Sequence, residues 1–230
     1  MIHAGTVDEL RTLLAEVGAH AVRSGLVLAS GGNLSARLPG ADSFELTAAG
    51  TWLDRLNPDS GGDFSGGDFS GGDFSGGDFS TVACSDGAVL GGAGTPSTEW
   101  KLHWRTYQTR PDVNAIVHLH PQHAVLVDAL GEEIRLLTLD HANYVRSVGR
   151  VPYHPNGSDA LADAAALQAG EHNTMVLTHH GCSALGPDIG MAYRRAMNLE
   201  EAAVATYRLL VLGNRTLRFP PEHVAGLDHG

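Results

Sequence analysis

The chain has 230 residues, of which 43% are hydrophobic and 18% charged, as is usual for a globular protein with a sizeable core. Its formal charge of −11 at pH 7 argues against nucleic acid as a partner, because phosphate backbones bind to basic surfaces. Cys84 and Cys182 are too few for a disulfide framework. No secretory signal opens the chain and no apolar run reaches the roughly 18 residues of a membrane span. We therefore predict a cytoplasmic protein that binds neither nucleic acid nor membranes.

The first predicted element is an amphipathic helix near the N-terminus. Thr6 and Glu9 have the spacing of a capping box, and Gly25 is a stop signal. Helical spacing predicts burial of the apolar residues between them, which are Leu10, Leu13, Leu14, Val17 and Ala21. The apolar run 26–29 then predicts a strand that leads into a glycine loop at 30–35.

The rest of the chain mixes predicted strands and helices. The strands are expected at 44–47, 81–84, 88–90, 113–117 and 174–177, with Asp86-Gly87 as the turn of a hairpin. The helices are expected from Ser97 or Thr98 to Tyr107, after Pro121, from Ser158 to about Gly170, and over about 188–212. Because no linker separates these elements, we predict a single α/β domain over residues 1–230.

Residues 61–80 are four identical copies of Gly-Gly-Asp-Phe-Ser. Neighbouring copies would occupy different environments in a folded protein, so packing does not require their sequences to be identical. The spacing matches neither an EF-hand nor a nonapeptide β-helix repeat. We interpret the segment as an expanded loop, or as an artefact of the sequence, without a function of its own.

His118-Leu119-His120 follows the strand predicted at 113–117. Alternate residues of a strand share a face, so the two imidazoles are expected side by side. A third histidine would complete a His3 site with one open position, which is how catalytic zinc is usually held. Ordinary strand histidines are the alternative, and only the surrounding residues can decide between the two.

Three other segments carry candidate chemistry. Ser97 and Thr98 stand at the start of a predicted helix, where hydroxyls and free amides favour an anion. The glycine turns at 31–33 and 49–50 each follow a predicted strand and could offer amides to the same anion. Glu99 could serve a nearby metal as ligand or act as a general base.

Taken together, these residues resemble the class II sugar-phosphate aldolase family, most closely its L-fuculose-1-phosphate aldolases. The resemblance covers most of the chain in the family's order. It rests on Ser30-Gly-Gly-Asn-Leu-Ser35, Thr47-Ala-Ala-Gly50, Pro96-Ser-Thr-Glu-Trp100, Val117-His-Leu-His120 and His179-His-Gly181. It implies a three-layer α/β/α sandwich around a largely antiparallel mixed sheet.

The resemblance also implies roles for individual residues. His118, His120 and His180 would bind Zn2+, while the neighbouring His179 would not. Glu99 would be the catalytic base, and a fourth ligand when no substrate is bound. The substrate phosphate would be held by Gly32, Asn33, Gly50, Ser97 and Thr98.

The implied reaction is cleavage of a ketose 1-phosphate to dihydroxyacetone phosphate and an aldehyde, such as lactaldehyde. The implied assembly is a homotetramer with sites at subunit interfaces, where a tyrosine from a neighbouring subunit assists at the aldehyde oxygen. Tyr144 is the candidate for that residue, and His141 is the alternative. The family's C-terminal tyrosine has no counterpart in the tail of this chain.

Several other activities share the scaffold. The segment 144–152 resembles that of 3-oxo-tetronate 4-phosphate decarboxylases, and 5-deoxyribulose or 5-methylthioribulose 1-phosphates are alternative aldolase substrates. L-Ribulose-5-phosphate 4-epimerases carry an acidic residue where this chain has Asn143, and they usually have aspartate where it has Glu99. Both differences disfavour epimerisation, because an amide cannot transfer a proton. A non-catalytic adducin-like module would be expected to lose the histidines that this chain keeps.

Overall fold

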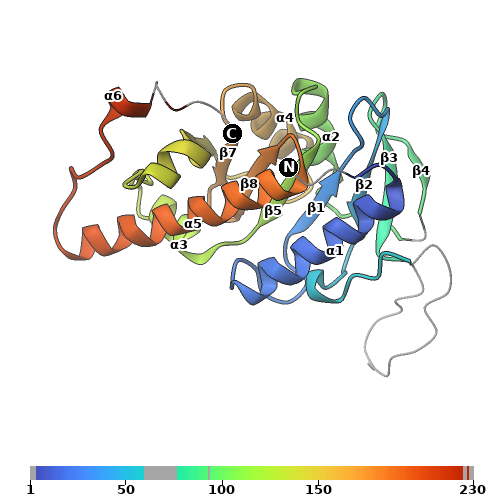
Figure 1. Cartoon of the computed structure of the whole chain (residues 1–230), viewed down its shortest axis with the longest axis horizontal. Helices are drawn as coiled ribbons and strands as arrows, with labels where there is room; N and C mark the ends of the chain where they lie inside the picture. The colour runs from blue at the N-terminus through green and yellow to red at the C-terminus, as the bar shows by residue number, and fades with distance from the viewer. Residues whose placement is uncertain (1–3, 60–76, 93, 225–226, 228–230) are drawn as a thin grey trace.

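The computed structural model describes residues 4–59, 77–92, 94–224 and 227. Eight strands form one mixed sheet in the order β4-β3-β2-β1-β5-β8-β7-β6 (Figure 1). The β6–β7 pair is parallel and the other neighbouring pairs are antiparallel. The strands are β1 (Asn33–Ala36), β2 (Ser43–Thr47), β3 (Phe79–Ala83), β4 (Val89–Gly91), β5 (Ala115–Leu119), β6 (Val148–Val151), β7 (Thr174–Leu177) and β8 (Gly181–Gly186).

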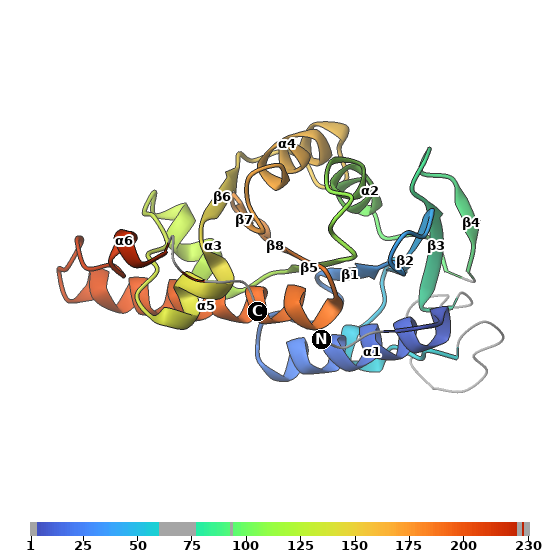
Figure 2. The same cartoon turned by 45° about the horizontal axis from the view of Figure 1, so that its top comes forward.

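Helices cover both faces of this sheet, which gives the three layers expected from the sequence (Figure 2). Helices α1, α3 and α5 lie on one face, and α2 and α4 lie on the other. The α-helices are α1 (Val7–Arg23), α2 (Trp100–Thr109), α3 (Gln122–Ala129), α4 (Asp159–Ala169), α5 (Ile189–Val211) and α6 (Pro221–Val224). A 3-10 turn at Leu53–Arg55 and a π-helical turn at His141–Val145 complete the described elements. None of the described helices combines the length and apolar character needed to cross a membrane.

Strand β5 shows how the alternation of side chains builds two separate cores. Ala115, Val117 and Leu119 belong to the apolar cluster beneath α1, α3 and α5. Ile116 belongs to the cluster beneath α2 and α4. His118 has the same parity as Ile116, so it faces the α2 side, where Glu99 begins the helix. The sheet thereby aims the predicted ligand at the predicted base.

The strand predicted at 26–29 is wrong. Leu26 and Val27 are buried in the core without being part of a strand. Positive φ angles at Gly25, Ala29 and Gly32 interrupt the extended backbone that a strand requires. The first strand begins only at Asn33, inside the predicted glycine loop. The apolar run therefore reflects burial and not strand pairing.

Other expectations are met or shifted by a few residues. The capping box of Thr6 and Glu9 forms, and Ser158 caps α4. The helix expected to be capped by Ser97 or Thr98 starts later, with Glu99 at its N-cap position and its carboxylate making no cap hydrogen bond. Leu13 and Val17 are only partly buried. Strands β6 and β8 were not predicted.

Most of the Gly-Gly-Asp-Phe-Ser repeat lies outside the described residues. In its last copy, Phe79 and Ser80 begin β3 and are buried, with exposed fractions of 2% and 0%. The Asp78 carboxylate accepts a hydrogen bond from the Asn57 amide at 2.7 Å. The last copy thus contributes to the fold, and the expanded-loop interpretation of the rest stays a prediction.

Candidate metal centre and active site

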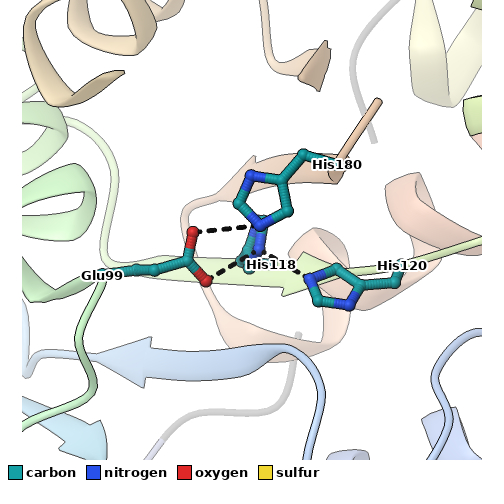
Figure 3. Close-up of side chains that lie close together, drawn as sticks. All are labelled: Glu99, His118, His120 and His180. Atoms are coloured by element: carbon teal, nitrogen blue, oxygen red, sulfur yellow. Dashed lines mark hydrogen bonds and ion pairs between the residues drawn. The ribbon is translucent and has the colours of Figure 1, made fainter. Parts of the chain in front are cut away.

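Four side chains that are distant in the sequence converge at one end of β5 (Figure 3). Glu99 comes from the start of α2, His118 from β5, His120 from just beyond it, and His180 from the turn before β8. One possible ligand atom from each lies within 4.8 Å of those of the other three. The structure thus brings together the three predicted histidine ligands and the predicted base.

The distances within the group match the geometry of a metal site. His118 Nε2 lies 3.2 Å from His120 Nε2 and 3.1 Å from Glu99 Oε2. His180 Nε2 lies 3.2 Å from Glu99 Oε1. A tetrahedral zinc with Zn–N bonds of about 2.0–2.1 Å places its ligand atoms about 3.3 Å apart. Glu99 Oε1 is also a buried oxygen without a hydrogen-bond partner among the described residues. The donor set therefore fits a divalent cation.

The electrostatics keep these groups in the forms that bind metal. Burial, followed by the neighbouring His118 and His180, lowers the pKa of His120 to about 4. Burial and His118 also lower the pKa of His180. Burial alone would raise the pKa of Glu99, but His118, His180 and the amide of Asn33 outweigh it and hold that pKa well below its usual value. At neutral pH His120 and His180 are thus neutral and able to donate a lone pair to a metal, and Glu99 is ionised.

Gly181 allows β8 to approach the histidines closely. A Cβ atom at this position would lie 2.4 Å from the Leu119 carbonyl oxygen and 2.7 Å from His120 Cδ2. His179, the residue that the resemblance leaves unligated, has φ +60°, a conformation that turns the chain between β7 and β8. The His-His-Gly sequence therefore combines a tight turn, a ligand and a contact that only glycine permits.

The residues predicted to hold phosphate come from three segments that approach this group. Gly32 and Asn33 stand at the start of β1, which pairs with β5 through Asn33 and His118. The turn after β2 reaches the segment before Glu99, where the Ala49 amide donates to the Thr95 carbonyl at 2.8 Å and Ala48 bridges Pro96. This brings Gly50 toward Ser97, which is buried, and Thr98, which is exposed.

The side chain of Asn33 is engaged at both ends. Its Nδ2 donates to Glu99 Oε2 at 2.9 Å, and its Oδ1 lies 2.5 Å from His103 Nε2. The structure therefore places this amide on the predicted base. The phosphate role predicted for Asn33 stays a prediction.

Sequence reasoning missed three residues that extend this contact into the core. His103 Nδ1 lies 2.6 Å from Ser35 Oγ, which lies 2.8 Å from the Tyr107 hydroxyl. Spacing was the signal available in the sequence. Glu99, His103 and Tyr107 recur every four residues, which places them on one face of a helix, and Asn33 and Ser35 alternate on one face of a strand.

Tyr144 lies away from the histidines of its own chain. It lines a cavity at the opposite end of β5 and β8 together with Arg110, Asp112, Val113, Asn143, Arg146, Asn173, Gly186, Pro187, Met191 and Arg195. Its alternative, His141, is only 1% exposed and accepts from the Leu137 amide at 3.3 Å. Of the two candidates, the structure leaves Tyr144 the more accessible.

Comparisons with known proteins show which proteins this chain is similar to. The family model described as "Class II Aldolase and Adducin N-terminal domain" matches residues 12–207. The L-fuculose phosphate aldolase of Methanococcus maripaludis strain C5 is 30% identical over 187 residues, or 81% of this chain and 90% of that protein. The 5-deoxy-D-ribulose 1-phosphate aldolase of Bacillus thuringiensis is 33% identical over 142 residues, or 62% and 66% of the two chains.

The fold has a solved counterpart in YgbL of Klebsiella pneumoniae, described by the alternatives aldolase, epimerase and decarboxylase. The two structures superimpose with a TM-score of 0.81 and 28% sequence identity, over 98% of this chain and 100% of YgbL. The chain therefore belongs to the class II aldolase and adducin N-terminal domain family, and it is a class II aldolase, an enzyme of the lyase class.

Proposed function

We propose that this enzyme is a zinc-dependent aldolase that cleaves a ketose 1-phosphate of the L-fuculose 1-phosphate type. The products would be dihydroxyacetone phosphate and an aldehyde such as lactaldehyde. The observation that carries the proposal is the position of Glu99, an ionised and 4% exposed carboxylate within 3.2 Å of two histidines of a His3 group. A base beside a cation site is what cleavage next to a carbonyl requires.

His118, His120 and His180 would hold the metal, with Glu99 as a fourth ligand in the absence of substrate. When bound, a divalent ion polarises the substrate carbonyl and offsets the negative charge that develops as the carbon–carbon bond breaks. In cleavage the hydroxyl of the carbon that becomes the aldehyde loses its proton, and Glu99 would deliver a proton to the carbon that has lost its partner, so that no net proton is consumed. In the condensation direction Glu99 would remove the proton from that carbon. Its lowered pKa keeps the Glu99 side chain ionised, as a metal ligand must be, when no substrate is bound.

The phosphate of the substrate would be held by the glycine turns and the start of α2. Gly32, Gly50, Ser97 and Thr98 would offer backbone amides and hydroxyls to the phosphate. Anchoring the phosphate there would place the carbons to be separated beside Glu99, so that binding energy is used for orientation.

The aldehyde half of the substrate would be contacted across a subunit interface. Tyr144 cannot serve the histidines of its own chain, because it lies at the opposite end of β5 and β8. We therefore keep the prediction of a homotetramer in which Tyr144 of a neighbouring copy assists at the aldehyde oxygen. A cytoplasmic location stays part of the same proposal.

A second candidate activity is decarboxylation of a 3-oxo-tetronate 4-phosphate. The similarity to YgbL favours keeping it, since the alternatives named for that protein include a decarboxylase. The similarity to the 5-deoxy-D-ribulose 1-phosphate aldolase supports cleavage instead, with a different aldehyde half.

The test is a cleavage assay with the zinc-loaded protein and L-fuculose 1-phosphate, in which dihydroxyacetone phosphate is reduced by a coupling enzyme and NADH loss is followed. Glu99→Gln is expected to lower kcat by about 10²–10⁴-fold, because proton transfer is lost while the shape is kept. The 5-deoxyribulose and 5-methylthioribulose 1-phosphates are assayed in parallel. Release of CO2 from a 3-oxo-tetronate 4-phosphate is measured separately.

Two results would contradict the proposal. One is a wild-type protein that releases no dihydroxyacetone phosphate from any of the ketose 1-phosphates. The other is a Glu99→Gln variant that cleaves as fast as the wild type.

A further inference from the structure

A chain of buried polar side chains runs from Glu99 into the core between α2 and β1. Asn33, His103, Ser35 and Tyr107 follow one another through hydrogen bonds of 2.5–2.9 Å, beginning at Glu99. Each of these side chains belongs to a residue that is at most 4% exposed. Burying several polar groups is costly unless all are paired, so the arrangement calls for a reason.

The direction of every hydrogen bond in this chain is determined by the ionised carboxylate. Glu99 can only accept, so Asn33 must turn its Nδ2 toward Glu99 and its Oδ1 toward His103. His103 Nε2 must then carry the proton. Burial, followed by the nearby His118, lowers the pKa of His103 to about 3, so the ring is neutral and its Nδ1 is an acceptor.

The remaining two bonds follow from that tautomer. Ser35 must donate its hydroxyl proton to His103 Nδ1, and its oxygen is then free to accept from the Tyr107 hydroxyl. Burial raises the pKa of Tyr107, which keeps the phenol protonated and able to donate. The Tyr107 ring is itself fixed by Phe44, at a centroid distance of 4.9 Å, and by the Arg37 guanidinium at 4.6 Å.

The residue spacing along α2 and β1 explains how the five side chains come to lie one after another. Four residues of an α-helix advance by about 6 Å, and two residues of a strand by about 6.7 Å. Glu99, His103 and Tyr107 on α2 therefore keep pace with Asn33 and Ser35 on β1. The hydrogen bonds thereby connect Tyr107, in the core, to the carboxylate of Glu99 without a break.

We propose that His103 is a positioning residue for Glu99. Through Asn33 it holds one carboxylate oxygen in place, so that Glu99 stays between His118 and His180 instead of turning into solvent or to the amides of its own helix. The inference rests on the proposed function of Glu99. It adds that the orientation of the base is set from the core, by residues that never touch substrate or metal.

The test compares His103→Leu, which fills a similar volume but can neither donate nor accept, with His103→Gln, whose amide can still donate to Asn33. Thr106→Val is the matched control. Thr106 is also buried in α2, but among the described residues its hydroxyl bonds only to the Leu102 carbonyl of the same helix, at 2.8 Å. Each variant is loaded with Co2+ for absorption spectra and for competition with a chelator, and with Zn2+ for kcat and KM on L-fuculose 1-phosphate.

We expect His103→Leu to lower kcat by about 10–100-fold, the usual effect of residues that orient the groups of a metal site, with KM changed by less than about twofold. Its Co2+ spectrum is expected to shift and its metal affinity to fall. His103→Gln should recover most of the loss, and Thr106→Val should match the wild type. If His103→Leu does not fold, Ser35→Ala breaks the same chain by removing one oxygen and should lower kcat less strongly in the same direction.

Three outcomes would overturn the inference. His103→Leu or Ser35→Ala could behave as Thr106→Val does, or His103→Gln could be no better than His103→Leu. A rise in KM with unchanged kcat would instead show that the chain serves substrate binding. If the wild type cleaves no ketose 1-phosphate, the proposed function fails, while the Co2+ spectra and chelator competition still decide whether His103 orients Glu99.

Discussion

The two ends of β5 and β8 both carry polar clusters, and the clusters differ in what their side chains face. At one end, Glu99, His118 and His180 direct ligand atoms at one another. At the other end, arginines donate to backbone carbonyls. Arg110 donates to Ala169 at 2.8 Å and Arg195 to Leu185 at 2.6 Å. The first cluster leaves the buried Glu99 Oε1 without a hydrogen-bond partner among the described residues, which indicates a site for a cation. The arginines of the second cluster bind groups of the protein itself, which indicates a structural role.

The largest effect is expected from a side chain added at Gly181, where β8 approaches the histidines closely. Gly181→Ala would press a methyl group against the Leu119 carbonyl and His120, so the ligands must separate. We expect metal affinity to fall by about 10–100-fold, as for other changes that displace ligands. Chelator competition with Co2+ measures it. Gly91→Ala in β4 is the control, because an added Cβ meets nothing within 4 Å there. Equal affinities in the two variants would contradict the account.

A smaller effect is expected from the arginine end. Arg110 binds the Asp112 carboxylate through Nε at 2.8 Å and Nη2 at 2.7 Å, and its Nη2 also donates to Asn173 at 3.0 Å. Arg110→Ala should lower the free energy of unfolding by about 2 kcal/mol, since hydrogen bonds to charged groups contribute about 1.5–3 kcal/mol. Urea unfolding measures the loss. A loss of metal affinity in Arg110→Ala would contradict the assignment of a purely structural role to this end.

The smallest effect is a pH dependence that arises from His103. Its pKa is about 3 in the folded protein, against 6.5 for the unperturbed residue. Between these values the unfolded chain binds one more proton, so stability is fully present above pH ~6.5 and is lost as pH falls, by about 1.4 kcal/mol per unit. His118 adds to the lowering of this pKa and Glu99 opposes it. Urea unfolding of the metal-free protein at pH 7 and pH 5 should show a shallower slope for His103→Leu, and equal slopes would contradict this prediction.

Local patterns in the sequence predicted much of the fold. The Thr6 capping box, the hairpin at Asp86-Gly87 and the Ser158 cap depend on neighbouring residues, and the structure confirms them. The strand at 26–29 was wrong because an apolar run reports burial, while strand pairing also depends on the φ angles of the residues around it. Strand β8 was missed because Gly181 and Gly186 weaken its strand pattern, and it is defined by pairing with β5 and β7.

The candidate site divides in the same way. The His118 and His120 pair could be read from strand alternation, but only tertiary structure shows that Glu99 and His180 lie beside it. Glu99 and His103 are linked through Asn33, which lies 66 and 70 residues before them in the sequence. The four-residue spacing shows that Glu99 and His103 share a helix face, but only tertiary structure shows that Asn33 lies against that face.

The most direct measurement of the central claim is the metal content of the purified protein after reconstitution with Zn2+ and removal of free ions, determined by plasma mass spectrometry. We expect about one zinc per chain in the wild type, as a His3 site with an open position implies, and close to none in His118→Ala. His179→Ala, at the neighbouring histidine that the group does not include, should retain the metal. A metal-free wild type, or a His118→Ala variant that binds zinc as the wild type does, would contradict the account.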